Sequence, residues 1–83
     1  MAKNRDERLP VQRALDAVAS LKPGSWESVE ALALLAIEAK GRPESVSLRE
    51  AARSASAGLK PGTWESVRAL ACLARADREL AAE

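Results

Sequence analysis

Apolar residues recur at helical spacing in four stretches of the chain, and turn or capping residues separate these stretches. Pro10 suits the first turn of a helix, where its missing N–H needs no partner. The pattern after it predicts an amphipathic helix over residues 10–21, whereas the charged residues 1–9 lack this period and are expected to form a flexible tail. The apolar positions of this first helix are Val11, Ala14, Leu15, Val18 and Leu21.

A second helix is predicted from Trp26 to Lys40. Ser25 is a good N-cap residue, and Gly41 suits the position just after a helix. The apolar positions cover about half of the helix circumference, so we expect this helix to lie centrally, in contact with both neighbours or with a second subunit. Its main apolar face consists of Trp26, Val29, Leu32, Ala33, Ala36 and Ile37.

The third and fourth helices follow a linker at residues 41–46. Ser47 and Glu50 have the spacing of a capping box, which predicts a helix from Ser47 to about Ala57. Thr63 is the expected N-cap of the fourth helix. The fourth helix repeats the apolar face of the second with Trp64, Val67, Leu70, Ala71 and Ala74, and this face is expected to be held by packing as well.

The similarity between the second and fourth helices extends through the turns before them. Residues 21–40 and 59–78 are identical at thirteen of twenty positions, and the two segments begin 38 residues apart. We therefore predict one all-α domain, a four-helix bundle or short helical stack, built from two tandemly duplicated αα-hairpins at residues 10–40 and 47–82. Its expected structural anchors are the turn and first-turn residues Pro23, Gly24, Trp26, Pro61, Gly62 and Trp64.

The composition limits the core that such a fold can form. Hydrophobic residues make up 47% of the 83 residues, but Ala supplies 18 of them and Phe and Tyr are absent. Alanine favours helices that approach closely and buries little surface. A single core is only marginally stabilising at this length. Self-association, or a protein partner that completes the core, is therefore expected.

Charge and cysteine content restrict the expected binding partners and the cellular compartment. The net charge is +1 and the charges are spread along the chain, which gives no support for binding to nucleic acid or to an anionic membrane. Cys72 is the single cysteine, which fits a reducing compartment. No apolar run approaches 18 residues and no export signal follows Met1, so the sequence predicts a cytoplasmic protein without a membrane-spanning segment.

Catalytic chemistry has few candidate groups. The chain has no His, the commonest general base, and no Tyr. A single Cys without His argues against a thiol hydrolase, and metal-ligand spacing and phosphate-binding loops are absent from the sequence. We expect no catalytic residue, no cofactor and no metal, and hence a protein that is not an enzyme.

Candidate interaction residues come from comparing the two copies. Leu34 and Cys72 are equivalent positions on the otherwise polar sides of their helices, which predicts a second contact surface for dimerisation or for a partner. Arg49 and Arg53 form an edge of the third helix. The predicted interaction surface consists of Glu30, Leu34, Arg49, Arg53, Arg68, Cys72 and Arg75, with Glu30 expected to face Arg68 if the halves pack about a pseudo-twofold axis.

Two resemblances carry alternatives. Residues 48–70 resemble a helix-turn-helix, with Gly58 as the turn glycine and residues 63–73 as the recognition helix, which implies a dimeric DNA-binding regulator. The Leu-x-Pro turn before an aromatic-led helix is similar to that of tetratricopeptide-like repeats, which implies stacked hairpins, although the period is 38 here and about 34 in that family. A purely structural self-assembling bundle is the third alternative to an adaptor, inhibitor or assembly protein.

Overall fold

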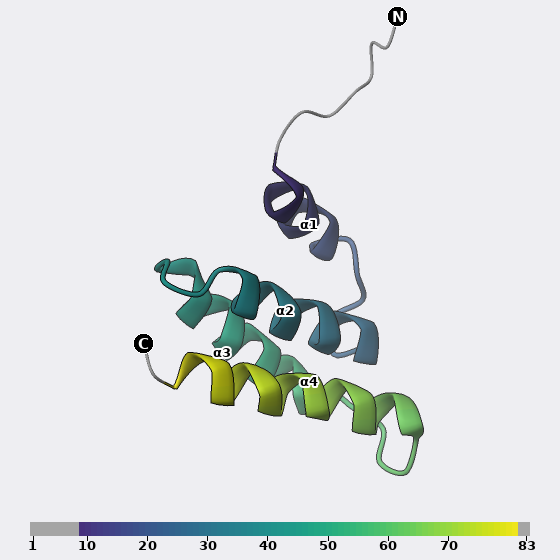
Figure 1. The fold of residues 1–83 in the computed structure, drawn as a ribbon. Helices are drawn as coiled ribbons and strands as arrows, with labels where there is room; N and C mark the ends of the chain where they lie inside the picture. Colours follow the sequence, from purple (N-terminus) through teal and green to yellow (C-terminus); the bar gives the residue numbers. More distant parts are fainter. Residues whose placement is uncertain (1–8, 82–83) are drawn as a thin grey trace, which may run out of the picture.

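A computed structural model describes residues 9–81 of the chain, so most of the predicted tail at residues 1–9 lies outside the described residues. In the described part, all regular structure is helical (Figure 1). The helices are α1 (Pro10–Val18), α2 (Trp26–Glu38), α3 (Glu44–Ser56) and α4 (Trp64–Leu80). The predicted all-α fold, a small bundle or short stack of four helices, is confirmed.

The capping residues before α2 and α4 form the bonds that the sequence predicts. The Ser25 hydroxyl accepts a hydrogen bond from the Ser28 backbone N–H at 3.2 Å. The Thr63 hydroxyl accepts one from the Ser66 backbone N–H at 3.1 Å. Each bond satisfies one of the N–H groups that a helix start leaves without a partner. Both helices therefore begin at their tryptophans.

The boundaries of α1 and α3 differ from the prediction. α1 ends at Val18, and the chain continues to Leu21 in turns held by bonds between residues three apart, from Ser20 N–H to the Ala17 carbonyl and from Leu21 N–H to the Val18 carbonyl. α3 begins at Glu44, three residues before the predicted start at Ser47. The physical reason is Pro43, which occupies the N-cap position with helical dihedrals (φ −58°, ψ −31°). The predicted capping box consequently lies inside the helix.

α2 is the central helix, as its composition predicts. It contacts each of the other three helices, whereas α1 contacts only α2 among the described helices. In Figure 1, α2 and α4 run side by side in the same direction, and α3 returns behind them in the opposite direction. α1 lies on the side of α2 that faces away from α4. The arrangement is a short stack of hairpins.

The core is formed mainly by alanine and leucine. Its buried cluster joins α2, α3 and α4 through Ala33, Ala36, Ala52, Leu73, Ala76 and Leu80. Four of these six residues are alanines, so the helix backbones can approach closely although the chain has few large side chains. Partly buried Leu32, Ile37, Leu48 and Cys72 pack around the cluster.

The fourth helix uses a different face from the one that its similarity to α2 predicts. Val29, Ala33 and Ala36 on α2 are fully buried. Their counterparts on α4, Val67, Ala71 and Ala74, are exposed. α4 instead packs on the core with Ser66, Ala69, Leu73, Ala76 and Leu80. The expectation that the repeated face of α4 is packed is therefore wrong, because no further hairpin of the described chain covers it.

Candidate interaction surface

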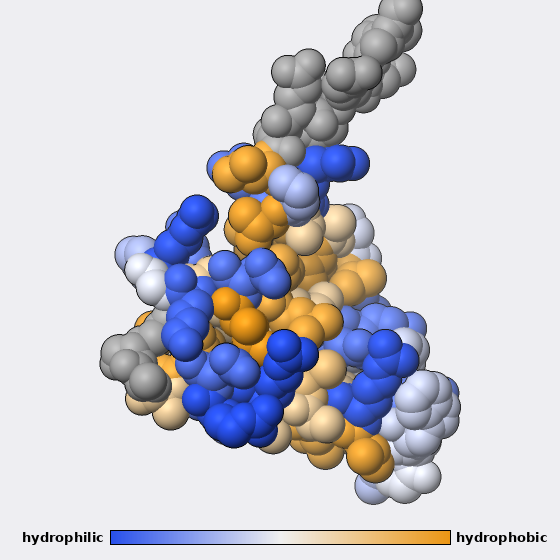
Figure 2. All heavy atoms as spheres, viewed as in Figure 1, coloured by the Kyte–Doolittle hydropathy of each residue, from blue (hydrophilic) through white to orange (hydrophobic). Residues whose placement is uncertain are grey.

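The exposed face of α4 is the largest departure from the expected burial. Trp64, Val67 and Leu70 are exposed by 64%, 66% and 47%. Ala71 and Ala74 extend this face along the helix, and we call these five residues the α4 outer face. Figure 2 shows apolar surface along the edge of α4 that points away from α2. Contiguous exposed apolar residues of this size are typical of a binding surface.

Arg68 lies beside the α4 outer face and is held from two sides. Its guanidinium carbon is 5.7 Å from the centre of the Trp64 ring, within the range of a cation–π contact. Its Nε atom donates a hydrogen bond to Glu30 Oε2 at 3.1 Å, and its Nη2 atom forms an ion pair with the same oxygen at 3.0 Å. The Glu30 side chain is only 14% exposed. The Glu30–Arg68 pair predicted from the sequence is thus present, although the helices that carry it are parallel.

A second apolar feature lies between α1 and α2. The two helices enclose an open groove of about 350 Å³, which we call the α1–α2 groove. It is lined by Ala14, Ala17, Val18, Leu21, Ala31, Leu34 and Leu35. Leu34 is 39% exposed there. Apolar surface is visible in the same region of Figure 2.

Cys72 does not share the surroundings of its counterpart Leu34. It is partly buried and packs against the core cluster, so it does not form an outer surface with Leu34. Burial raises the pKa of the Cys72 thiol, and the Glu30 carboxylate raises it further, while Arg68 and Arg75 act in the opposite direction. The thiol is therefore neutral near pH 7 and unsuited to act as a nucleophile.

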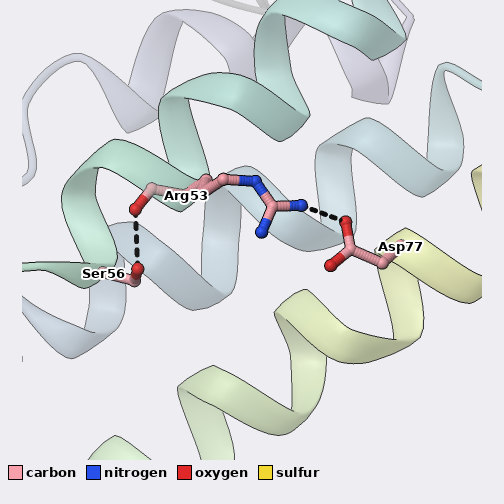
Figure 3. A network of polar contacts seen from close by, with 3 residues as sticks. All are labelled: Arg53, Ser56 and Asp77. Atoms are coloured by element: carbon pink, nitrogen blue, oxygen red, sulfur yellow. Dashed lines mark hydrogen bonds and ion pairs between the residues drawn. The ribbon is translucent and has the colours of Figure 1, made fainter.

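The two arginines of α3 that the sequence suggests as interaction residues differ in their surroundings. Arg53 Nη2 donates to Asp77 Oδ1 on α4, and the Ser56 hydroxyl donates to the Arg53 carbonyl at 2.6 Å (Figure 3). Arg49 is partly buried, and its Nε atom has no hydrogen-bond partner. The Arg53–Asp77 ion pair links α3 to α4. Arg75, by contrast, is exposed on α4.

The two Pro-Gly turns lie near each other at one end of the stack. Both turn glycines have positive φ, +81° at Gly24 and +86° at Gly62, a conformation that other residues rarely adopt. Gly24 also lies against Gly58, at the end of α3, so closely that a side chain at Gly58 would meet the Gly24 carbonyl oxygen at 3.1 Å. A shallow depression of about 440 Å³ between the turns includes Lys22, Trp26 and Lys60 in its lining.

The two tryptophans expected to anchor these turns differ in burial. Trp26 is half-buried beside the turns, whereas Trp64 belongs to the exposed α4 outer face. Sequence reasoning therefore missed Val67 and Leu70 as surface residues. The available signal was the similarity of the two segments, because the second hairpin covers the face of α2 and no further helix of the described residues covers the equivalent face of α4.

Several kinds of site lack a basis in residues 9–81. These residues include no group of three or more His, Cys, Asp or Glu side chains placed to hold a metal ion. None of the helices in this part of the chain is both long and apolar enough to cross a membrane. The exposed chemistry of the described molecule is thus that of apolar helix faces bordered by arginine and glutamate.

Comparison of the chain with protein-family models, with curated proteins and with solved structures finds no match to any of them.

Proposed function

We propose that this chain is a non-enzymatic protein–protein interaction module that works by presenting helix faces. The observation that carries the proposal is the α4 outer face, on which Trp64 and Val67 are 64% and 66% exposed although the chain has few large apolar residues. Aromatic and arginine side chains contribute most of the binding energy at many interfaces. Trp64 with Arg68 stacked near it, at 5.7 Å, supplies both kinds of side chain.

The same features support an interaction module over the DNA-binding alternative. Residues 57–63 separate α3 from α4, a longer connection than the turn of three or four residues in a helix-turn-helix. A phosphate backbone requires free cations, whereas Arg53 and Arg68 are bound to the carboxylates of Asp77 and Glu30. The surface of the would-be recognition helix is apolar at Val67 and Leu70.

Site-specific photo-crosslinking tests the proposal. A photoreactive amino acid at position 67 is compared with the same group at position 50, because Glu50 is exposed on α3 and lies outside the α4 outer face. In cells that produce the protein, we expect adducts with a protein, either this chain or another, from position 67 and not from position 50. Adding Leu70→Glu should remove them. Absent adducts, or equal adducts from both positions, would overturn the proposed function.

A further inference from the structure

We propose that the partner of the α4 outer face is a second copy of this chain, bound head to tail with its α1–α2 groove against that face. This inference rests on the proposed function and names its partner. It requires that the α4 outer face of one copy fit the α1–α2 groove of another. The interface between α2 and the second hairpin, inside the chain, is built from the equivalent residues.

The α4 outer face repeats the face with which α2 binds the second hairpin. Val67, Ala71 and Ala74 occupy the positions that Val29, Ala33 and Ala36 occupy in the first copy. On α2 these three side chains are fully buried, two of them in the cluster with α3 and α4. On α4 the equivalent three are exposed. The surface with which α2 binds the second hairpin is thus repeated on α4. No hairpin of the described residues covers it there.

The α1–α2 groove repeats the complementary half of the same interface. Its residues Ala14, Ala31 and Leu35 correspond to Ala52, Ala69 and Leu73. Those counterparts are buried between α3, α4 and α2, at 0%, 0% and 6% exposure. The position of Leu34 in the groove corresponds to Cys72, which packs against the core cluster. The α1–α2 groove is therefore equivalent to the surface of α3 and α4 on which α2 packs. In the groove, however, this surface is open.

The geometry of the stack places these two halves at opposite ends. α2 and α4 run in the same direction (Figure 1), and the contact between Glu30 and Arg68, which are equivalent positions 38 residues apart, sets the two helices in register. The hairpins are consequently related by a shift along the stack and not by a twofold axis. α1 and α4 lie on opposite sides of α2 (Figure 1). A contact between the free ends is heterologous, and it can repeat from copy to copy.

The charges that differ between the copies also fit this contact. Within the chain, Ile37 on α2 packs against a cluster that contains Ala76. Between copies, the equivalent positions carry Arg75 on the α4 side and Glu38 on the groove side, and both are exposed. Apolar positions inside the chain would therefore be replaced by opposite charges between chains. Such complementarity fixes the partner and the register of an interface.

Complementation between two blocked variants tests the proposal. Val67→Glu should block the α4 outer face and Leu34→Glu the α1–α2 groove, and each variant keeps the other surface intact. By light scattering after size exclusion, we expect wild type to form assemblies, each variant alone to be monomeric at 8.8 kDa, and an equimolar mixture to form a heterodimer of twice that mass. A twofold contact between like surfaces predicts no recovery on mixing, and this outcome would overturn the head-to-tail arrangement.

Charge reversal gives a second test that does not depend on the packing of Leu34. Arg75→Glu and Glu38→Arg should each shift association to at least tenfold higher concentration, and the double variant should restore it because the opposite charges are exchanged. Glu50→Arg on α3 is the matched control and should leave association unchanged. A double variant as weak as either single variant would contradict the proposal.

The two proposals can fail separately. A wild-type chain that stays monomeric up to about millimolar concentration overturns self-stacking. If position 67 then still yields adducts with a different protein, the interaction module stands with another partner. If neither assemblies nor adducts form, both proposals are overturned.

Discussion

Arg68 on α4 donates a hydrogen bond from Nε to Glu30 Oε2 on α2 at 3.1 Å and forms an ion pair with the same oxygen through Nη2 at 3.0 Å, and the two residues occupy equivalent positions in the similar segments 21–40 and 59–78. Each is the fifth residue of its helix. Contact between equivalent positions fixes the register of two parallel helices, because a shift by one turn would separate the charges by about 5 Å. The pair therefore specifies orientation more than it contributes free energy.

The two members of this pair should differ in what their removal costs. Glu30 is 14% exposed on its side chain and its Oε1 atom is buried without a hydrogen-bond partner, whereas Arg68 is 53% exposed. Arg68→Ala leaves a largely buried carboxylate unpaired, and we expect it to lower the free energy of unfolding by about 1–2 kcal/mol. Arg53→Ala should cost less, about 0–1 kcal/mol, because Arg53 and Asp77 are both well exposed. Urea unfolding measures both, and equal losses would contradict this account.

Much of the fold follows from local sequence signals. Ser25 and Thr63 predict the starts of α2 and α4 because a hydroxyl before a helix satisfies an N–H that otherwise lacks a partner. The apolar width of α2 predicts its central place. The start of α3 was missed because two local signals competed, and Pro43 prevailed over the capping box that begins at Ser47.

The identity of the buried face could not be predicted for α4. Both the face with Val67 and the face with Leu73 are apolar, so the helical pattern alone permits either orientation. Tertiary contacts decide, and here they depend on how many hairpins stack. The same ambiguity predicts Cys72 on an outer surface, whereas Cys72 is partly buried and packs against the core cluster. Leu34, its counterpart, lies in the open groove between α1 and α2.

The contact between Gly58 and Gly24 should make Gly58 sensitive to any side chain. A Cβ atom at Gly58 would lie 3.1 Å and 3.2 Å from backbone atoms of Gly24, which cannot move independently of the turn. Gly58→Ala should therefore lower the free energy of unfolding by about 1–3 kcal/mol, as overpacking does. Denaturant unfolding measures it, and an unchanged midpoint would mean that the turn yields.

Gly41 is the matched control for this substitution. It has φ +87°, and apart from its two chain neighbours nothing lies within 4 Å of an added Cβ, so its constraint is conformational and not steric. Asparagine tolerates that conformation better than alanine does. Gly41→Asn should thus cost less than Gly41→Ala, while Gly58→Asn should cost at least as much as Gly58→Ala.

The second turn depends on a relay of hydroxyl groups. The Thr63 hydroxyl donates to the Ser66 hydroxyl at 2.9 Å, and the Ser66 hydroxyl donates to the Lys60 carbonyl. In the first turn Ser25 bonds the corresponding Lys22 carbonyl directly, at 2.7 Å. Thr63→Ala and Ser66→Ala should each cost about 1 kcal/mol.

Coupling between these two substitutions tests the relay. Because each substitution interrupts the same set of bonds, the double variant should lose less free energy of unfolding than the sum of the single losses. A double-mutant cycle by urea unfolding measures this difference. Additive losses would show that the two hydroxyl groups act independently.

α1 should be the least stable of the described helices. It has no buried residue and contacts only α2. Local opening costs little where few apolar contacts are lost. Hydrogen exchange followed by mass spectrometry should show faster exchange in residues 10–18 than in α2, whose Val29, Ala33 and Ala36 are fully buried. Equal protection in both helices at a concentration where the chain is monomeric would contradict this ranking.

The Cys72 thiol should make stability depend on alkaline pH. Burial, with the Glu30 carboxylate, raises the pKa of this thiol in the folded chain above its ordinary value. The unfolded chain therefore forms the thiolate at a lower pH than the folded chain, and the unfolded state gains from ionisation first. The contribution of the thiol to stability is complete below the unfolded pKa and is lost as pH rises through the folded pKa. From about pH 8.5 upward, wild type should lose free energy of unfolding more steeply than Cys72→Ala, which has no thiol to ionise. Urea unfolding of both proteins from pH 7 to 10 measures the two slopes, and parallel slopes would show that the thiol ionises equally easily in both states.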